Sequence, residues 1–218
     1  MAFIRWRDGI GCKPTPANHQ TRSAGFLNNS RRIPFDGVPT NGVHQREKKN
    51  MPHFPKRFYH NPIHFLQDLA YILANAPRTR ALIRGSISPT FRERLMMAVT
   101  SVNACRYCAY FRAQVALTSG ISPAEIEQIL DGVFTRAPER ELPALLYAQH
   151  WAETNMQPDP AARAKLIATY GDDTARTIEY VLRMIRVGNL LGNTFDYILY
   201  RLSFGRLGLP CRQSAPTV

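Results

Sequence analysis

Two cysteines separated by two residues, Cys105 and Cys108, are the side chains of this sequence best suited to covalent chemistry. Thiols at this spacing can close a disulfide, bind a soft metal ion or pack as small apolar side chains. Residues three and four apart share one face of a helix, so Cys105, Cys108 and Arg112 are predicted to form a stripe. Three interpretations therefore stand side by side: a redox dithiol, a metal site and a pair of core cysteines.

A metal site would need further ligands, and the sequence has no second CxxC and no pair of histidines near the cysteines. The other two cysteines, Cys12 and Cys211, are remote along the chain. A thiolate is the reactive form of cysteine, and its pKa falls near a helix N-terminus or a cation. The pair lies in the first turns of a predicted helix, next to Arg106, and this favours the redox dithiol. The first cysteine of such a pair is expected to be the more exposed and the second the more buried.

The N-terminal residues do not resemble a secretory signal, because Arg5, Arg7 and Asp8 interrupt any apolar stretch. We therefore expect a cytoplasmic, reducing environment, in which a close cysteine pair is more often catalytic or metal-binding than structural. The apolar segment 178–202 contains several charged and amide side chains. It is predicted to be a buried helix, and no membrane partner is expected.

Half of the net charge of +12 falls in residues 1–50, which hold 9 Lys/Arg against 3 Asp/Glu. This segment is rich in Gly, Pro, Asn and Ser and shows no sustained helical or strand period. It is predicted to be a disordered or loosely attached basic tail. A basic balance can indicate nucleic-acid binding, but residues 51–218 contain no basic stripe with interleaved aromatic residues. No nucleic-acid partner is expected.

Residues 51–218 predict a single all-α domain of about seven helices, since no segment alternates as a strand does. Ser88-Pro89 and Ser122-Pro123 are strong helix starts, in which serine caps and proline takes the first helical position. Asn103 is expected to cap the helix that carries the cysteines, and Asp172 or Asp173 to cap the last helix. The predicted helices span 62–76, 89–99, 104–119, 123–132, 141–154, 161–170 and 172–202.

Residues 87–94, 99–108 and 120–126 resemble the alkyl hydroperoxidase D / carboxymuconolactone decarboxylase family. The family's signature is a Glu, then twelve residues later the first Cys of a CxxC pair, then a His four residues after the second Cys. Glu93, Cys105 and Cys108 match in type and spacing, whereas Arg112 occupies the position of the His. The resemblance extends from Met51 to about Leu207. It implies the helical bundle of the alkyl hydroperoxidase D-like type.

The resemblance also implies a thiol-dependent peroxidase or dithiol–disulfide oxidoreductase. In this interpretation Cys108 attacks the peroxide, Cys105 resolves the product to a disulfide, and Glu93 is the base. Arg112 stays protonated and cannot relay a proton as histidine does, so it would act electrostatically and could pair with Glu93. Tyr107 is a candidate hydrogen-bond donor to substrate, with simple packing as the alternative. No cofactor is expected beyond an external dithiol reductant, and the family suggests a homo-oligomer, a trimer or hexamer.

Two other functions stay open. The chain could be a carboxymuconolactone decarboxylase-type lyase, or a non-catalytic helical oligomer that has lost the relay histidine. Asn189, Asn193 and Asp196 share a helical stripe, and they are predicted to line a pocket or to satisfy helix ends at a subunit contact. His53, His60 and His64 precede the core and could fold over the site, and His150 lies on a predicted helix of the second half. Each is expected to be a surface or packing residue.

Overall fold

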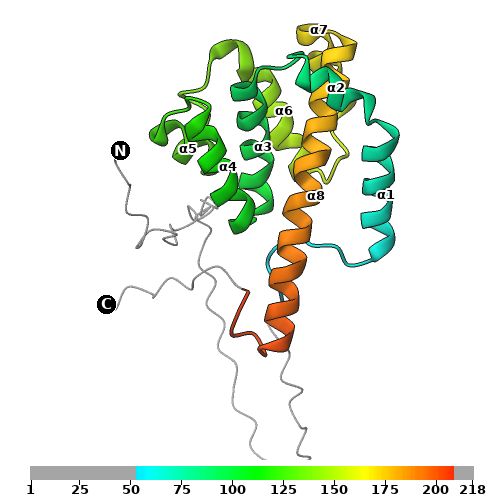
Figure 1. Cartoon of the computed structure of the whole chain (residues 1–218), viewed down its shortest axis with the longest axis vertical. Coiled ribbons are helices and arrows are strands. Elements are labelled where there is room, and N and C mark those ends of the chain that lie inside the picture. Colours follow the sequence, from blue (N-terminus) through cyan, green and yellow to red (C-terminus); the bar gives the residue numbers. More distant parts are fainter. Residues whose placement is uncertain (1–52, 209–218) are drawn as a thin grey trace, which may run out of the picture. The chain divides into compact units, whose positions relative to one another are not determined.

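The computed structural model describes residues 53–208, and the regular secondary structure of this part of the chain is helical, with no strand (Figure 1). The predicted all-α class is confirmed. The predicted basic tail, residues 1–50, lies outside the described residues, as do residues 209–218. The α-helices are α1 (Pro62–Ala74), α2 (Pro77–Ile83), α3 (Pro89–Asn103), α4 (Arg106–Thr118), α5 (Pro123–Leu130), α6 (Leu142–Glu153), α7 (Pro160–Tyr170) and α8 (Asp172–Leu202), with a short 3-10 helix at Glu139–Glu141.

Helix α3 lies at the centre of the fold and packs against α4, α5, α6 and α8 (Figure 1). Its residues 93–100 are all buried, so apolar and polar side chains alike face neighbouring helices. Burial of this apolar surface is the main stabilising contribution to such a bundle. Glu93 belongs to the buried run and is 0% exposed. The functional carboxylate predicted from the sequence is therefore an interior group that requires a partner.

The two predicted serine caps are confirmed. Ser88 accepts a hydrogen bond from the backbone N–H of Phe91 at the start of α3, and Ser122 accepts one from Glu125 at the start of α5. The side chain of Glu125 turns inward, where its carboxylate accepts a hydrogen bond from Arg94 Nε at 2.6 Å. Glu125, in the first turn of α5, is thus bonded to an interior arginine.

Two details of the predicted elements are wrong. Residues 77–83 form α2, where a connection between helices was expected; this helix is short and opens with Pro77 at its first position. Helix α8 is capped by the backbone of Gly171, whereas Asp172 and Asp173 lie inside its first turn. Carboxylates in the first turn still favour the helix electrostatically, so aspartates occur at a helix start both as caps and inside the first turn.

A tight turn joins α3 to α4 and decides the position of the cysteines. Ala104 caps α3 in the left-handed conformation, with φ 53°, and Cys105 then adopts extended backbone as the N-cap of α4. Asn103 is the last residue of α3, so the prediction that it caps α4 is wrong. A left-handed C-cap is usually glycine, and alanine there gives no sequence signal of where the chain turns.

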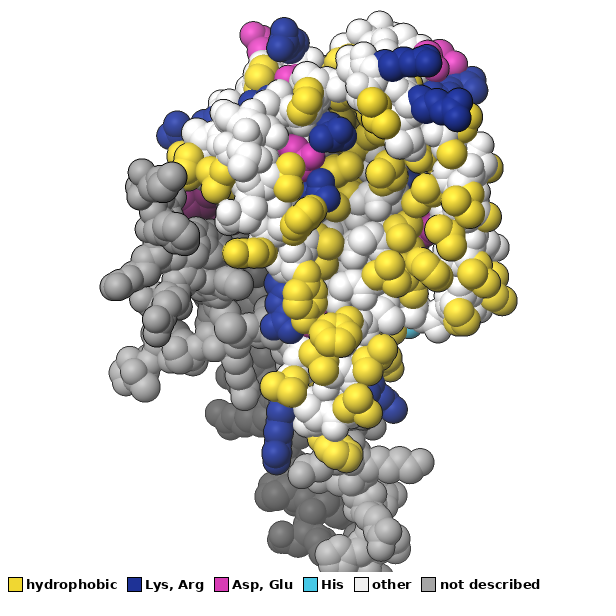
Figure 2. Space-filling model, in the orientation of Figure 1, with side chains coloured by type: hydrophobic (Ala, Val, Ile, Leu, Met, Phe, Trp, Pro, Cys, Tyr) yellow, Lys and Arg dark blue, Asp and Glu magenta, His cyan; other side chains and the backbone are white. Residues whose placement is uncertain are grey.

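Helix α8 is long, and its C-terminal half extends past the neighbouring helices in Figure 1. No helix in the described part of the chain is long and apolar enough to cross a membrane. Large apolar side chains remain exposed at spacings of four, three and four residues along this half, and apolar surface gathers over it in Figure 2. They are Leu191, Phe195, Ile198 and Leu202.

Candidate dithiol site

Cys105 lies at the N-cap of α4, where the first backbone N–H groups of a helix have no carbonyl partner within the helix. Its Sγ accepts a hydrogen bond from the backbone N–H of Cys108 at 3.4 Å, and the residue is 0% exposed. The N-terminal end of a helix carries partial positive charge, and this favours a thiolate at Cys105 over a neutral thiol. The turn between α3 and α4 therefore places one sulfur where its negative form is stabilised.

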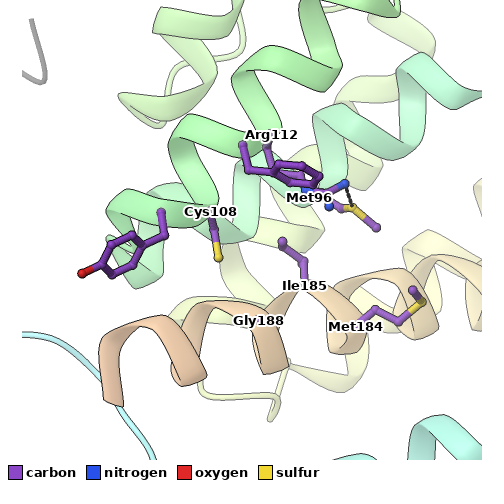
Figure 3. Close-up of a pocket in the computed structure, with 8 residues that line it drawn as sticks. Met96, Cys108, Arg112, Met184, Ile185 and Gly188 are labelled. Carbon is purple, nitrogen blue, oxygen red and sulfur yellow. Dashed lines mark hydrogen bonds between the residues drawn. The ribbon is translucent and has the colours of Figure 1, made fainter. Parts of the chain in front are cut away.

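Cys108 is partly exposed and borders a pocket of about 350 Å³. Figure 3 shows its sulfur pointing toward α8, close to Gly188 and Ile185. Apolar side chains dominate the wall, and Arg112 is the charged residue in it. The lining residues are Met96, Tyr107, Cys108, Phe111, Arg112, Met184, Ile185 and Gly188.

The order of exposure in the pair is the reverse of the expectation that the first cysteine is the more exposed. Cys105 is buried, whereas Cys108 is the sulfur that a molecule in the pocket can reach. The reason is the N-cap position of Cys105, which places its sulfur against Gly192 of α8. Exposure of Cys108 agrees with the attacking role that the family resemblance implies for it.

The pKa values of the two thiols are shifted in opposite directions. A hydrogen bond from Cys108 lowers the pKa of Cys105 to about 7, backbone N–H groups and the charge of Lys56 act in the same direction, and burial opposes them. The pKa of Cys108 is raised, first by this hydrogen bond to Cys105 and then by burial and by the charge of Cys105. The pair therefore loses its first proton near neutral pH, with the negative charge centred on Cys105.

Glu93 is held by arginines in the interior. Arg112 Nη1 donates to both carboxylate oxygens of Glu93, at 3.0 and 3.3 Å, and Arg92 Nε lies 3.4 Å from one of them. The predicted pairing of Arg112 with Glu93 is therefore present. Arg112 Nη1 also lies 3.2 Å from Met96 Sδ, the contact drawn as a dashed line in Figure 3. Arg112 therefore compensates the negative charge of this buried carboxylate.

Tyr107 borders the pocket, but its hydroxyl group is already bonded. The hydroxyl donates to Asp196 Oδ1 at 2.9 Å and accepts from Arg106 Nη2 at 2.7 Å. Its single hydrogen is therefore donated to Asp196 and is not free for a substrate. Asp196, which is 0% exposed, also accepts from Arg106 and from Lys56, each at 2.8 Å.

The amide stripe of α8 lies inside the fold and bonds to the end of α3. Asn193 Nδ2 donates to the carbonyl of Asn103 at 2.7 Å, and Asn189 Oδ1 accepts from Thr100 Oγ1 at 3.2 Å. Both asparagines are 0% exposed and neither borders the pocket. Asn193 thus satisfies a carbonyl at the C-terminal end of α3 within the chain.

Two glycines of α8 make room for the two sulfurs. A Cβ at Gly192 would lie 2.6 Å from Cys105 Sγ, and one at Gly188 would lie 3.8 Å from Cys108 Sγ. The spacing of four residues on α8 thus matches the spacing of the cysteines on α4. Neither glycine was among the residues predicted for the site, although a pair of glycines four apart in a long apolar helix is a recognisable sign of close packing.

The histidines of the described residues lie away from the pocket wall. His60 packs on the ring of Phe58, with centroids 4.0 Å apart, and His150 Nε2 lies 3.2 Å from Asp159 Oδ2. They do not take the place of the missing relay histidine. Among residues 53–208, no group of three or more His, Cys, Asp or Glu side chains could hold a metal ion.

Residues 71–154 match the model of the carboxymuconolactone decarboxylase family. This match covers 84 of the 218 residues. The resemblance stated from the cysteine motif is thereby confirmed for residues 71–154. No curated protein and no solved structure gave a significant match.

The family segment contains all five predicted site residues, namely Glu93, Cys105, Tyr107, Cys108 and Arg112. It does not contain the side chains that complete the surroundings of Cys105. Lys56 precedes it, while Gly192 and Asp196 follow it on α8. The carboxymuconolactone decarboxylase family match therefore covers the dithiol and its Glu–Arg pair, and the rest of the site comes from segments that only the fold brings near.

Proposed function

We propose that this protein is a thiol-dependent peroxidase, or dithiol–disulfide oxidoreductase, that works through Cys105 and Cys108. The observation that carries the proposal is the asymmetry of the pair. One sulfur is stabilised as a thiolate at a helix N-terminus, and its neighbour borders an apolar pocket. A structural pair of core cysteines would not need either feature.

In the first step, the thiolate of Cys105 accepts the proton of Cys108 along their hydrogen bond. The Cys108 thiolate then attacks the terminal oxygen of a hydroperoxide, the O–O bond breaks, and Cys108 becomes a sulfenic acid. The alkoxide leaves and takes a proton from solvent. The pair needs to lose only one proton for this attack, so Cys105 replaces the family's relay histidine as the proton acceptor.

In the second step, the Cys105 sulfur attacks the sulfenic sulfur of Cys108. A disulfide forms, and the hydroxyl group of the sulfenic acid leaves as water together with the proton of Cys105. An external dithiol then reduces the Cys105–Cys108 disulfide through a mixed disulfide and is itself oxidised. No cofactor enters this cycle. A reducing cytoplasm would supply the dithiol, whose carrier is the expected protein partner.

Arg112 has an electrostatic role in this proposal. It is bonded to Glu93 and borders the pocket that Cys108 faces, so a cation lies beside the leaving alkoxide. A fixed charge at a position where negative charge develops stabilises the transition state without reorganisation. Glu93 holds the guanidinium in place and is not itself the base, a role that passes to Cys105.

The exposed apolar stripe of α8 supports the expected homo-oligomer. Leu191, Phe195, Ile198 and Leu202 are each at least 44% exposed and follow one another at helical spacing. Contiguous apolar surface of this kind is typical of protein–protein contacts. We propose that copies of the chain pack on this face, as a trimer or hexamer.

The function is tested by adding hydroperoxide to the reduced full-length protein and following the Cys105–Cys108 disulfide by mass spectrometry of peptides. We expect a disulfide to form stoichiometrically, and turnover once a dithiol is added. Because the thiolate is the reactive form, the rate should rise with pH through about 7, the pKa of Cys105, and then level off. Absence of the disulfide would contradict the proposal.

Replacement of Arg112 by histidine, Arg112→His, distinguishes the mechanisms. Cys105 already accepts the proton, so we expect the rate of disulfide formation to change by less than about tenfold. A positioned acid–base group contributes about 10²–10⁴. A gain in that range would show that the arginine had weakened a histidine-dependent peroxidase. An inert wild type whose variant is also inert would indicate a non-catalytic oligomer, and Arg112→Lys is the charge-preserving control.

A further inference from the structure

The segment that precedes α1, residues 53–61, lies along the C-terminal half of α8. The ring of Phe54 contacts those of Tyr197 and Tyr200, with centroids 5.5 and 5.6 Å apart. The backbone N–H of Tyr59 donates to Thr194 Oγ1 at 3.1 Å. These contacts hold the segment against α8 at Phe54 and again at Tyr59. The segment lies outside the family match, which begins at residue 71.

Lys56 is the charged residue that this segment carries into the interior. Its side chain is 5% exposed, and its Nζ lies 2.8 Å from Asp196 Oδ2. The other oxygen of Asp196 accepts from Arg106 and Tyr107. A buried lysine is costly unless it is paired, and Asp196 provides that pairing. The next residue, Arg57, accepts a hydrogen bond at its carbonyl from Asn193, at 2.9 Å.

One face of α8 connects this ion pair to the dithiol. Gly188 faces the sulfur of Cys108, and Gly192 faces the sulfur of Cys105 together with the ring of Tyr107. Asp196 follows one helical turn later. Residues four apart lie above one another on a helix, so the Lys56–Asp196 pair is the next contact along the face after Cys105.

The cluster beside Cys105 has one positive charge in excess. Lys56 and Arg106 are both bonded to the single carboxylate of Asp196, and the Tyr107 hydroxyl is neutral. Arg106 is 39% exposed and partly screened by water, whereas Lys56 is buried. A buried charge acts more strongly on its neighbours than an exposed one. Loss of Lys56 would leave Asp196 facing the cysteine with only the screened arginine.

We propose that Lys56 is a positioning residue of the dithiol site, which neutralises Asp196 and keeps the surroundings of Cys105 positive enough to hold a thiolate. The inference rests on the proposed use of the dithiol, and it adds a segment that the family match does not contain. In the reduced protein the charge on Cys105 balances the excess of the cluster. The segment 53–61 is then part of the site and not only a covering of α8.

Charged and titratable groups lie on the elements packed around Cys105. The 53–61 segment brings Lys56, α4 brings Arg106, Tyr107 and Cys108, and α8 brings Asp196. From α3, the buried Glu93 is neutralised by Arg112. The pKa of Cys105 is lowered by the charge of Lys56 in addition to the hydrogen bonds it accepts, which agrees with the geometry.

The test measures the thiolate of Cys105 directly, independently of peroxide chemistry. The full chain is prepared with Cys12, Cys108 and Cys211 replaced by serine, so Cys105 is the single thiol and the hydroxyl introduced by Cys108→Ser can still donate to it. The pH dependence of alkylation by iodoacetamide is compared for Lys56, Lys56→Met and Lys56→Arg. We expect Lys56→Met to raise the apparent pKa by about one pH unit and to slow alkylation at pH 7 roughly fivefold, with recovery in Lys56→Arg.

Lys165→Met is the matched control, because Lys165 is exposed on α7 and its loss changes the net charge equally. It should leave the apparent pKa unchanged. Lys56→Gln keeps a donor toward Asp196 and serves if Lys56→Met unfolds; it should shift the pKa in the same direction. An unchanged pKa in a folded neutral variant overturns the inference. A shifted pKa in a protein that never reduces peroxide retains the inference and refutes the proposed function.

Discussion

Cys108→Ser should abolish peroxide reduction, whereas Cys105→Ser should stop the cycle after one attack. Cys108 is the sulfur that borders the pocket, so its loss removes the nucleophile and should lower turnover by more than about 10³-fold. Without Cys105 there is no partner to resolve the sulfenic acid and no thiolate to accept the proton of Cys108. The sulfenic acid should then form about 10²-fold more slowly and persist on Cys108.

The measurement is trapping of sulfenic acid with dimedone, followed by peptide mapping, in chains whose Cys12 and Cys211 are replaced by serine. A Cys12/Cys211 double replacement with both site cysteines intact is the control, and it should turn over as the wild type does. Sulfenic acid on Cys105 in the Cys108→Ser protein, with none on Cys108 in the Cys105→Ser protein, would reverse the assigned roles. It would mean that the lower pKa of Cys105 outweighs the exposure of Cys108.

Gly192→Ala should destabilise the fold, while Gly188→Ala should not. Alanine is favoured over glycine in a helix by about 0.5–1 kcal/mol, so each replacement would stabilise α8 if space allowed. At Gly188 the new Cβ meets Cys108 Sγ at 3.8 Å, an ordinary contact. At Gly192 it would lie 2.6 Å from Cys105 Sγ, and the sulfur or the helix must move. Such overpacking costs about 1–3 kcal/mol.

Urea unfolding followed by circular dichroism gives the free energy of unfolding of each variant, provided that the dependence on denaturant concentration has the same slope in both. Gly188→Ala is the matched control for helix propensity, since both glycines are interior to α8. The Gly192→Ala protein should also form the Cys105–Cys108 disulfide more slowly, because its Cys105 is displaced from the N-cap of α4. Equal stability and equal disulfide rates in the two variants would show that Cys105 does not depend on close packing against α8.

Local signals predicted much of the fold. Serine followed by proline identified the starts of α3 and α5, because both the cap and the fixed proline φ act within one turn of the helix. The same kind of reasoning failed where no local residue marks the boundary. Ala104 turns the chain in a conformation that alanine seldom adopts, and the backbone of Gly171 caps α8 without a side chain. Tertiary packing decides these positions.

The candidate site was predictable to a similar degree. The sequence predicted the spacing of Glu93, Cys105 and Cys108. It also showed Arg112 at the position of the family's histidine and predicted that Arg112 could pair with Glu93. The order of exposure of the cysteines was not predictable, since it depends on which residue becomes the N-cap of α4. Asn193 and Asp196 were recognised as a polar stripe, but their partners lie roughly 90–140 residues away along the chain.

The sequence by itself determined that the described part of this chain is all-α, with a CxxC pair at the start of a helix, preceded by Glu93 and followed by Arg112. These features depend on helical periodicity and on spacings of a few residues, which are properties of the chain alone. Only the tertiary structure decided which sulfur is exposed and which charges surround the buried one. Lys56 and Asp196 are 140 positions apart, and their contact exists because the 53–61 segment packs on α8 beside the turn that holds Cys105.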